Sequence, residues 1–230
     1  MNLELKFCNH VAADYAVSRW HYSGCLPYGK KFKIGIWESG KFVGVIVFGR
    51  GACMNIGTPF GLKQDKVVEL VRIAMKPHKC RVSRCISIAL KMLQSKNPGL
   101  QLVVSYADES QGHLGKVYQA ANWIYLGWTR STYMRVRGVD YHIQSLAGKY
   151  GPKVGGINWL RKHIDPDAQP IIMPPKHKYV YALDKRLSEK LKGQSKPYPK
   201  CVASVENGTP GPPAGKGRCN SDRHAPLVNA

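Results

Sequence analysis

Hydrophobic and polar residues at the start of the chain follow the patterns of a strand, a helix and a hairpin. Residues 3–7 (Leu-Glu-Leu-Lys-Phe) alternate with a period of two, which predicts a half-buried strand. Residues 11–22 have apolar side chains at helical spacing, and Asn9 is suited to cap this helix. Two strands, 32–37 and 42–48, are joined by a Glu-Ser-Gly-Lys turn, which predicts a hairpin.

The rest of the pattern alternates between strands and helices. Further strands are predicted at 67–75, 102–106, 124–128 and 178–183, and helices at 82–93, 114–121, 143–150 and 157–163. The order β-α-β-β-β-α-β-α-β indicates the α/β class, with a mixed β-sheet flanked by helices.

From about residue 190 the composition shifts to Gly, Pro, Ser and Lys. Such a segment buries too little apolar surface to offset its chain entropy, so we expect a disordered basic tail. The predicted division is a folded domain over residues 1–189 and a tail over 190–230. The tail has seven Lys and Arg against two Asp and Glu. It therefore carries +5 of the formal net charge of +21, and the folded part carries +16.

The charge balance is strongly basic, with 35 Lys and Arg against 14 Asp and Glu in 230 residues. Such a chain binds polyanions by releasing their counterions, and nucleic acid is the commonest partner of this kind. Ribosomal and membrane-surface proteins are equally basic, so charge alone leaves these classes open. The longest apolar stretch, 43–48, is too short to cross a bilayer, and the N-terminus has no apolar signal region. We therefore expect a protein that works inside a cell, with no membrane partner.

The cysteines do not indicate a metal site. There are seven of them, and none lies in a Cys-x-x-Cys pair. In a protein that works inside a cell, this pattern predicts reduced, partly buried thiols. No metal ligands are assigned.

A basic turn lies between the strand at 67–75 and the helix at 82–93. Lys79, Arg81 and Arg84 supply charge there, and Ser83 supplies a hydroxyl donor. Free N–H groups and the helix dipole at a helix N-terminus favour an anion, so the turn is a candidate phosphate site. The alternative is a solvated basic loop. The turn is not a Walker loop, because GxxxxGK[ST] is absent.

Two further segments are candidates for chemistry. The run 105–113 (Ser-Tyr-Ala-Asp-Glu-Ser-Gln-Gly-His) follows a buried strand, where ligands commonly bind in α/β sheets. Asp108 is suited to act as a base or to cap the next helix. Tyr118 lies shortly before a helix end at Asn122. Its hydroxyl could donate a proton to a leaving group, or the ring could be an ordinary core aromatic.

These segments, in this order, resemble the GNAT acyltransferases. The resemblance implies a GNAT-like catalytic domain in which two splayed strands, 67–75 and 102–106, admit the pantetheine arm of acyl-CoA. The basic turn would hold the CoA pyrophosphate, and Tyr118 would face the thiolate. This turn departs from the family pattern because it has no glycine.

A closer resemblance is to the Mom family of phage DNA-modification proteins. It rests on blocks over about the first 200 residues, among them Trp20-His-Tyr-Ser-Gly24, Glu69-Leu-Val-Arg72, Ser105-Tyr-Ala-Asp108 and Tyr118-Gln-Ala-Ala-Asn-Trp123. The resemblance implies a transferase that modifies the exocyclic N6 amine of adenine in duplex DNA with a methylcarbamoyl or acetamido-type group. Such modification protects phage DNA from restriction in the host cytoplasm.

The resemblance also implies roles for single residues. His21 and Tyr22 would lie at the active site, and Asp108 and Tyr118 would handle protons. Without the resemblance, the sequence favours His21 as a partly exposed, cationic residue at the end of a helix over a functional role. The side chains expected to hold the cofactor or a DNA phosphate are Arg72, Lys79, Arg81, Ser83, Arg84 and Ser105.

Acetyl-CoA is the expected donor and double-stranded DNA the expected partner, and a homodimer is kept open. A methylcarbamoyl group has one N–H unit more than an acetyl group. A redox metal such as iron, with His10, His21 and His113 as ligands, is therefore kept as an option that no local motif supports. The adenine amine points into the base pair, so the base must be extruded; Trp20, Tyr22, Tyr28 and Trp128 are candidates to stack on it.

Two other functions stay open on the same fold. One is an acyl-CoA-dependent N-acyltransferase that acts on protein or small-molecule amines. The other is a non-catalytic DNA-binding protein on a GNAT scaffold.

Overall fold

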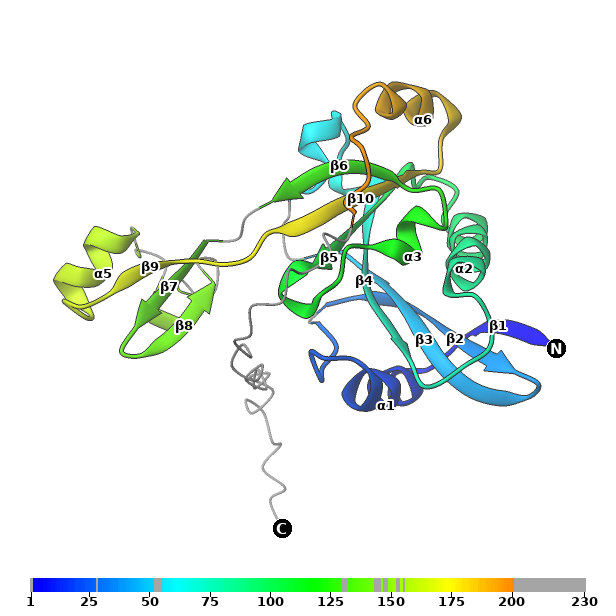
Figure 1. The fold of residues 1–230 in the computed structure, drawn as a ribbon, viewed down its shortest axis with the longest axis horizontal. Helices are drawn as coiled ribbons and strands as arrows, with labels where there is room; N and C mark the ends of the chain where they lie inside the picture. Colours follow the sequence, from blue (N-terminus) through cyan, green and yellow to red (C-terminus); the bar gives the residue numbers. More distant parts are fainter. Residues whose placement is uncertain are drawn as a thin grey trace, which may run out of the picture. The chain divides into compact units, whose positions relative to one another are not determined.

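The computed structural model describes residues 2–27, 29–51, 55–129, 132–142, 146, 149–151, 154 and 156–200. The chain divides into two compact units, whose elements are labelled in Figure 1. Within the described ranges, the first unit contains the chain up to Val104 together with Ala182–Leu187. The second contains Ser105–Tyr181 and the stretch from Ser188 to residue 200.

The first unit is built mainly from an antiparallel array of strands. Its elements are β1 (Leu3–Phe7), α1 (His10–Trp20), β2 (Lys31–Glu38), β3 (Lys41–Gly49), β4 (Val67–Met75), α2 (Val82–Lys96) and the start of β5 (Leu102–Asp108), with single 3-10 turns at Thr58–Phe60 (η1) and Gln64–Lys66 (η2). Strands β1, β2, β3 and β4 pair antiparallel in that order. Strand β5 is the next neighbour of β4 in the sheet, and α2 connects the two strands along the chain.

Local sequence explains these elements. Ser39 and Gly40 have φ angles of 46° and 79°, as the tight β2–β3 hairpin turn requires. The Asn9 side chain accepts the Ala12 N–H at 2.9 Å, which caps α1. Helix α1 buries only small residues, Ala13, Ala16 and Val17, so it lies close to the sheet.

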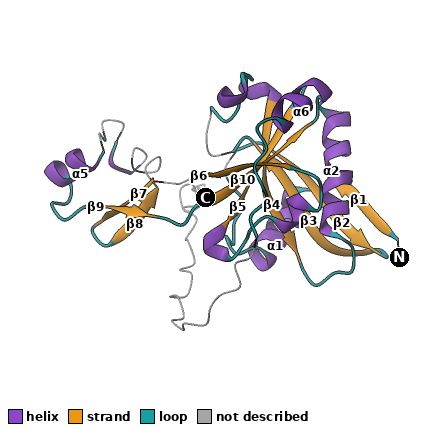
Figure 2. Ribbon diagram, turned by 45° about the horizontal axis from the view of Figure 1, so that its top comes forward, coloured by secondary structure: helices purple, strands orange, loops and turns teal. Residues whose placement is uncertain are grey.

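The core of the first unit has two layers around the sheet. On one face, α1 packs on Val45, Val47 and Ala74. The alternate residues Ile46 and Phe48 are also fully buried. Helix α2 lies on the other side of the sheet and buries Cys85, Ile86, Ala89, Leu90 and Leu93 (Figure 2). The predicted α/β class, with a mixed sheet flanked by helices, is confirmed.

The second unit contains the end of β5 and the strands and helices that follow it. These are η3 (Glu109–Gln111), α3 (Lys116–Gln119), β6 (Ile124–Thr129), β7 (Thr132–Val136), β8 (Val139–His142), α5 (Ile157–His163), β9 (Gln169–Ile172), β10 (Lys176–Ala182) and α6 (Lys185–Lys192), with β10 and α6 each crossing the division. Strand β10 pairs antiparallel with β6. The larger sheet has the order β1-β2-β3-β4-β5-β10-β6, and a smaller sheet has the order β8-β7-β9.

Most predicted elements are found within a few residues of their expected bounds. The strand at 67–75 and the helix at 157–163 match β4 and α5 at both ends. The first helix ends at Trp20, two residues earlier than expected, so His21 and Tyr22 lie in a loop. The predicted helix at 143–150 falls largely outside the described residues.

The predicted domain boundary at 189/190 falls inside α6. Beyond it, the Lys196 N–H donates to the Tyr125 carbonyl at 2.8 Å, and the Tyr198 hydroxyl donates to the Trp123 carbonyl at 2.7 Å. The chain up to these residues therefore packs on the second unit. Disorder of the tail stays a prediction for residues 201–230, which lie outside the described residues.

Candidate functional site

The predicted site residues are distributed over both units. Those in the first unit are His21, Tyr22, Arg72, Lys79, Arg81, Ser83 and Arg84, and those in the second are Ser105, Asp108 and Tyr118.

The loop after α1 lies against the middle of β4. The His21 ring stacks on the Tyr22 ring, with centroids 4.3 Å apart, and its Nδ1 lies 2.8 Å from the Ser23 hydroxyl. The loop is tied to the sheet where Arg72 Nε donates to the Cys25 carbonyl at 3.3 Å. Tyr22 is 54% exposed, so the loop presents an aromatic face to solvent beside an arginine.

Arg72 of β4 is a partly buried cation that contacts this loop. Burial lowers the pKa of its guanidinium, and the neighbouring Tyr22 and Glu69 act in the opposite direction. Its NH1 donates to the Val71 carbonyl at 2.7 Å. Tyr22 therefore stacks on His21 and interacts electrostatically with Arg72, while the roles of the three residues stay predictions.

A carboxylate that the sequence analysis did not consider, from Glu38 at the end of β2, binds the turn before α2. The Glu38 side chain accepts the Lys79 N–H at 3.1 Å and also the Cys80 N–H. Hydrogen bonds from the Cys80 thiol and from these amides lower the pKa of Glu38. The Glu38 carboxylate thus occupies two backbone N–H groups of the turn that was predicted to bind a phosphate.

The first turn of α2 itself still fits an anion. No side chain caps this helix at Arg81, and the first N–H groups of a helix have no partner within it. Arg81 and Arg84 are exposed on either side of Val82 and Ser83. This donor set suits a phosphate group of a CoA molecule, with Ser83 and the two arginines as the residues that would hold it.

In the second unit, Ser105 and Tyr118 form a buried pair. The Ser105 hydroxyl donates to the Tyr118 hydroxyl at 2.8 Å, and the two residues are 0% and 7% exposed. The Tyr118 ring packs on Trp123 and Tyr179, with centroid distances of 5.0 and 5.2 Å. Ser105, predicted as a cofactor contact, therefore positions the tyrosine.

Asp108 has its own partners. It caps η3 by accepting the Ser110 N–H at 3.1 Å and the Ser110 hydroxyl at 2.6 Å. Its other oxygen lies 3.4 Å from Lys176 Nζ. Asp108 therefore caps the 3-10 turn η3 and not the helix expected at 114–121, because α3 begins after Gly115 without a side-chain cap. A role as a base stays a prediction.

Sequence reasoning missed a buried histidine in this unit. His177 accepts or donates at Nδ1 to the Tyr125 hydroxyl, 2.8 Å away, and its Nε2 lies 3.6 Å from a Glu109 oxygen. Burial first and Glu109 second raise the pKa of Tyr125. The only sequence signal was a single His next to a predicted strand, and spacing alone does not distinguish a buried, hydrogen-bonded histidine from an exposed one.

The expectation of reduced thiols holds in part. Cys8, Cys80 and Cys85 are free, but Cys25 is disulfide-bonded. Spacing along the chain does not show which cysteines meet in space, so this bond was not foreseen. Among the described residues, no three His, Cys, Asp or Glu side chains are grouped to hold a metal ion. His10 and His21 lie in the first unit and His113 in the second.

Comparison with known proteins shows the family. The Mom protein family matches over residues 2–200. The chain belongs to the Mom family. Methylcarbamoylase mom of Escherichia phage Mu is 29% identical to it over 187 residues, which cover 78% of this chain and 76% of that protein.

Solved structures similar to this Mom family member include acetyltransferases. A spermidine N-acetyltransferase from Vibrio cholerae, in complex with CoA and spermine, has 9% identity and a TM-score of 0.44 over 80% of this chain and 98% of that one. NAA60 of Arabidopsis thaliana, with a bisubstrate analogue, has 8% identity and a TM-score of 0.46 over 80% and 100%. Within the described ranges, no helix is long and apolar enough to cross a membrane.

Proposed function

We propose that this Mom family protein transfers an acyl-type group from acetyl-CoA to the N6 amine of adenine in duplex DNA, and so protects the DNA from restriction in a host cell. Family membership over residues 2–200 carries the proposal. The relative from phage Mu is named a methylcarbamoylase. The net charge of +21 supports a polyanionic substrate.

The reaction sets two proton requirements. A new C–N bond to adenine forms as the C–S bond of the thioester breaks, so the amine loses a proton and the thiolate gains one. Acetyl-CoA, when bound, would supply the activated carbonyl and the thiol leaving group. A carboxylate is suited to accept the proton from the amine, and a phenol is suited to donate a proton to the thiolate.

Residues of the second unit are suited to these transfers. In the Ser105–Tyr118 hydrogen bond the serine hydroxyl donates and the phenol oxygen accepts. We assign donation to the thiolate to Tyr118 and acceptance from the amine to Asp108. One Asp108 oxygen lies 3.4 Å from Lys176 Nζ, so a cationic side chain stands beside the assigned acceptor.

Residues of the first unit are suited to binding. The exposed Tyr22 ring, stacked on His21, is a platform for an extruded base, since every base has a π-face. Arg72 supplies a charge beside it. At the start of α2, Lys79, Arg81, Ser83 and Arg84 would hold cofactor phosphates.

The test is nucleoside mass analysis of DNA from bacteria that express the protein. We expect a heavier deoxyadenosine with the wild type and its loss with Tyr118→Phe and Asp108→Asn. Tyr15→Phe and Asp14→Asn on the exposed side of α1 are matched controls and should retain the product. Circular dichroism of the purified variants checks that each one folds.

Other outcomes would favour other functions. Unmodified DNA together with tight DNA binding would favour a non-catalytic DNA-binding protein. Unmodified DNA with acetyl-CoA binding and weak DNA binding would favour an acyltransferase acting on other amines. A modified product that survives both site variants would contradict the assigned proton roles.

A further inference from the structure

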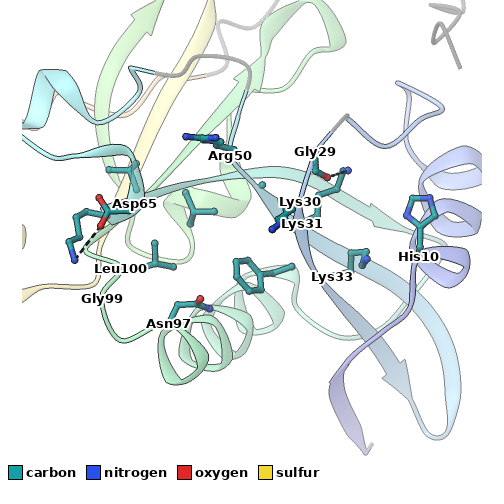
Figure 3. Close-up of a pocket in the computed structure, with 15 residues that line it drawn as sticks. His10, Gly29, Lys30, Lys31, Lys33, Arg50, Asp65, Asn97, Gly99 and Leu100 are labelled. Atoms are coloured by element: carbon teal, nitrogen blue, oxygen red, sulfur yellow. Dashed lines mark hydrogen bonds and ion pairs between the residues drawn. The ribbon is translucent and has the colours of Figure 1, made fainter. Parts of the chain in front are cut away.

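The first unit contains an open cavity of about 850 Å³ that none of the predicted catalytic or cofactor-binding residues lines (Figure 3). It is formed where β2 begins, β3 ends, β4 begins and the chain leaves α2. Its cationic lining consists of Lys30, Lys31, Lys33, Arg50 and Lys66, with His10 at one side. We call this cavity the basic groove.

Positive charge in the basic groove is hardly neutralised. Its one acidic side chain, Asp65, pairs with Lys66 at 3.6 Å. In the described part of the chain, no acidic side chain lies within ion-pair distance of Lys30, Lys33 or Arg50. Lys31 is partly buried beside Lys33, and burial together with this like charge lowers its pKa. Like charges gathered without counter-charges are costly unless an anion joins them.

The shape of the groove points to an extended anion. Lys31 and Lys33 are two residues apart on β2, so both side chains lie on one face of the strand. The apolar residues Val67 and Val68 are 4% and 5% exposed and form part of the wall. A membrane surface would instead need apolar side chains that project outward.

We propose that the basic groove binds the sugar–phosphate backbone of duplex DNA. This inference rests on the proposed function, because adenine in DNA is the substrate that the groove would hold in place. Backbone contacts of this kind fix position and orientation without reading sequence.

The groove is separate from the candidate CoA phosphate site. It lies at the first residues of β4, Val67 and Val68, whereas the turn that leads to α2 follows the last residue, Met75. A strand of nine residues spans roughly 26 Å at about 3.3 Å per residue. The groove therefore adds a second anion site to the first unit.

The test compares two double variants that remove the same charge. Lys30→Ala/Lys33→Ala removes two groove lysines, and Lys41→Ala/Lys91→Ala removes two exposed lysines outside the groove. Binding of the full-length protein to a labelled 20-base-pair duplex is measured by fluorescence anisotropy over a series of KCl concentrations. Acetyl-CoA binding is measured by calorimetry, and circular dichroism checks folding.

We expect the groove variant to reduce the slope of log affinity against log salt by about 2. Two lost phosphate contacts correspond to an affinity loss of about 60-fold at 0.1 M salt. The control should change the slope by less than half as much, and acetyl-CoA affinity should not change in either variant.

Two results would overturn the proposal. Equal DNA affinities and slopes for the two variants would show that the groove has no special role. A loss of acetyl-CoA affinity in the groove variant, with DNA binding intact, would make the groove part of the cofactor site. If the groove variant loses DNA affinity but the wild type makes no modified nucleoside, the proposed function is contradicted and the DNA-binding role of the groove stands. If the wild type modifies DNA but the groove variant binds DNA as well as the control does, only the DNA-binding role of the groove is contradicted.

Discussion

A methyl group added at Gly115 tests the packing that positions Tyr118. Gly115 caps α3 with a φ of 74°, and a Cβ atom there would lie 2.3 Å from Cε2 and 2.7 Å from Cζ of Tyr179. Tyr179 is fully buried, its hydroxyl donates to the Leu114 carbonyl at 2.6 Å, and Gln119 donates to that hydroxyl at 3.0 Å. The ring therefore has little room to move away.

Gly112 supplies the matched control. Its φ is 67°, and a Cβ atom there would meet nothing within 4 Å. Alanine in the left-handed region costs roughly 1–2 kcal/mol at either position. Overpacking against Tyr179 adds about 1–3 kcal/mol at Gly115 only. We expect Gly112→Ala to lower the free energy of unfolding by about 1–2 kcal/mol and Gly115→Ala by about 2–5 kcal/mol.

The assay is urea unfolding at 25 °C followed by far-UV circular dichroism, with thermal unfolding as a second measurement. A gap of about 1–3 kcal/mol corresponds to about 2–12 °C in Tm for a chain of this size. The DNA modification product should also fall more with Gly115→Ala, because α3 begins at the next residue and holds Tyr118. Equal destabilisation by the two alanines would refute the reasoning, since only Gly115 faces a ring.

Three further predictions concern single hydrogen bonds. Ser105→Ala and Tyr118→Phe should each lower the free energy of unfolding in urea by about 1 kcal/mol. The double variant should lower it by less than the sum of the two, by a difference of about 0.5–1.5 kcal/mol. Strictly additive losses would argue against a hydrogen bond between the two hydroxyls. Tyr125→Phe should lower the free energy of unfolding by about 1–3 kcal/mol, because it keeps the ring but removes the hydroxyl that hydrogen-bonds to the buried His177. A loss below about 0.5 kcal/mol in thermal unfolding would contradict this prediction. Glu38→Gln should lower the urea midpoint at pH 7. The folded pKa of Glu38 lies below its ordinary 4.5, so its stabilisation is present above that value and is lost as the pH falls through the folded pKa. The difference in midpoint between wild type and Glu38→Gln should therefore shrink as the pH falls below 4.5, and a difference that does not change with pH would exclude the carboxylate charge as the cause.

Hydrophobic periodicity predicted the elements that bury a continuous apolar surface. Strand β4 is a run of β-branched and apolar residues, and α2 has a strong apolar stripe, so both were placed from sequence. The small sheet was missed because β8 and β9 have only four residues each, too few for a period to be recognised. Its hairpin turn has Arg137 at a φ of 51° before Gly138, a weaker signal than Asn-Gly.

The candidate site was predictable only where residues lie close together in the chain. His21, Tyr22 and the Asp108 cap were visible because their partners are neighbours in sequence. Glu38 reaches an amide 41 residues away, and Tyr125 meets a ring 52 residues away. Such contacts depend on strand order and register, which a single sequence does not encode in its local pattern.

The positions of the acidic residues explain why so much positive charge stays available on this chain. Several carboxylates accept hydrogen bonds from backbone N–H groups. Glu38 and Asp108 do so at turns, and Asp165 accepts from the Arg137 and Asp167 amides at 2.6 and 3.0 Å. Among the residues that line the basic groove, Asp65 is the one acidic side chain. A mutation that adds an acid to the groove, such as Lys30→Glu, should therefore weaken DNA binding more than the same change at Lys91. Equal losses would mean that the net charge of the whole chain, and not its placement, governs affinity.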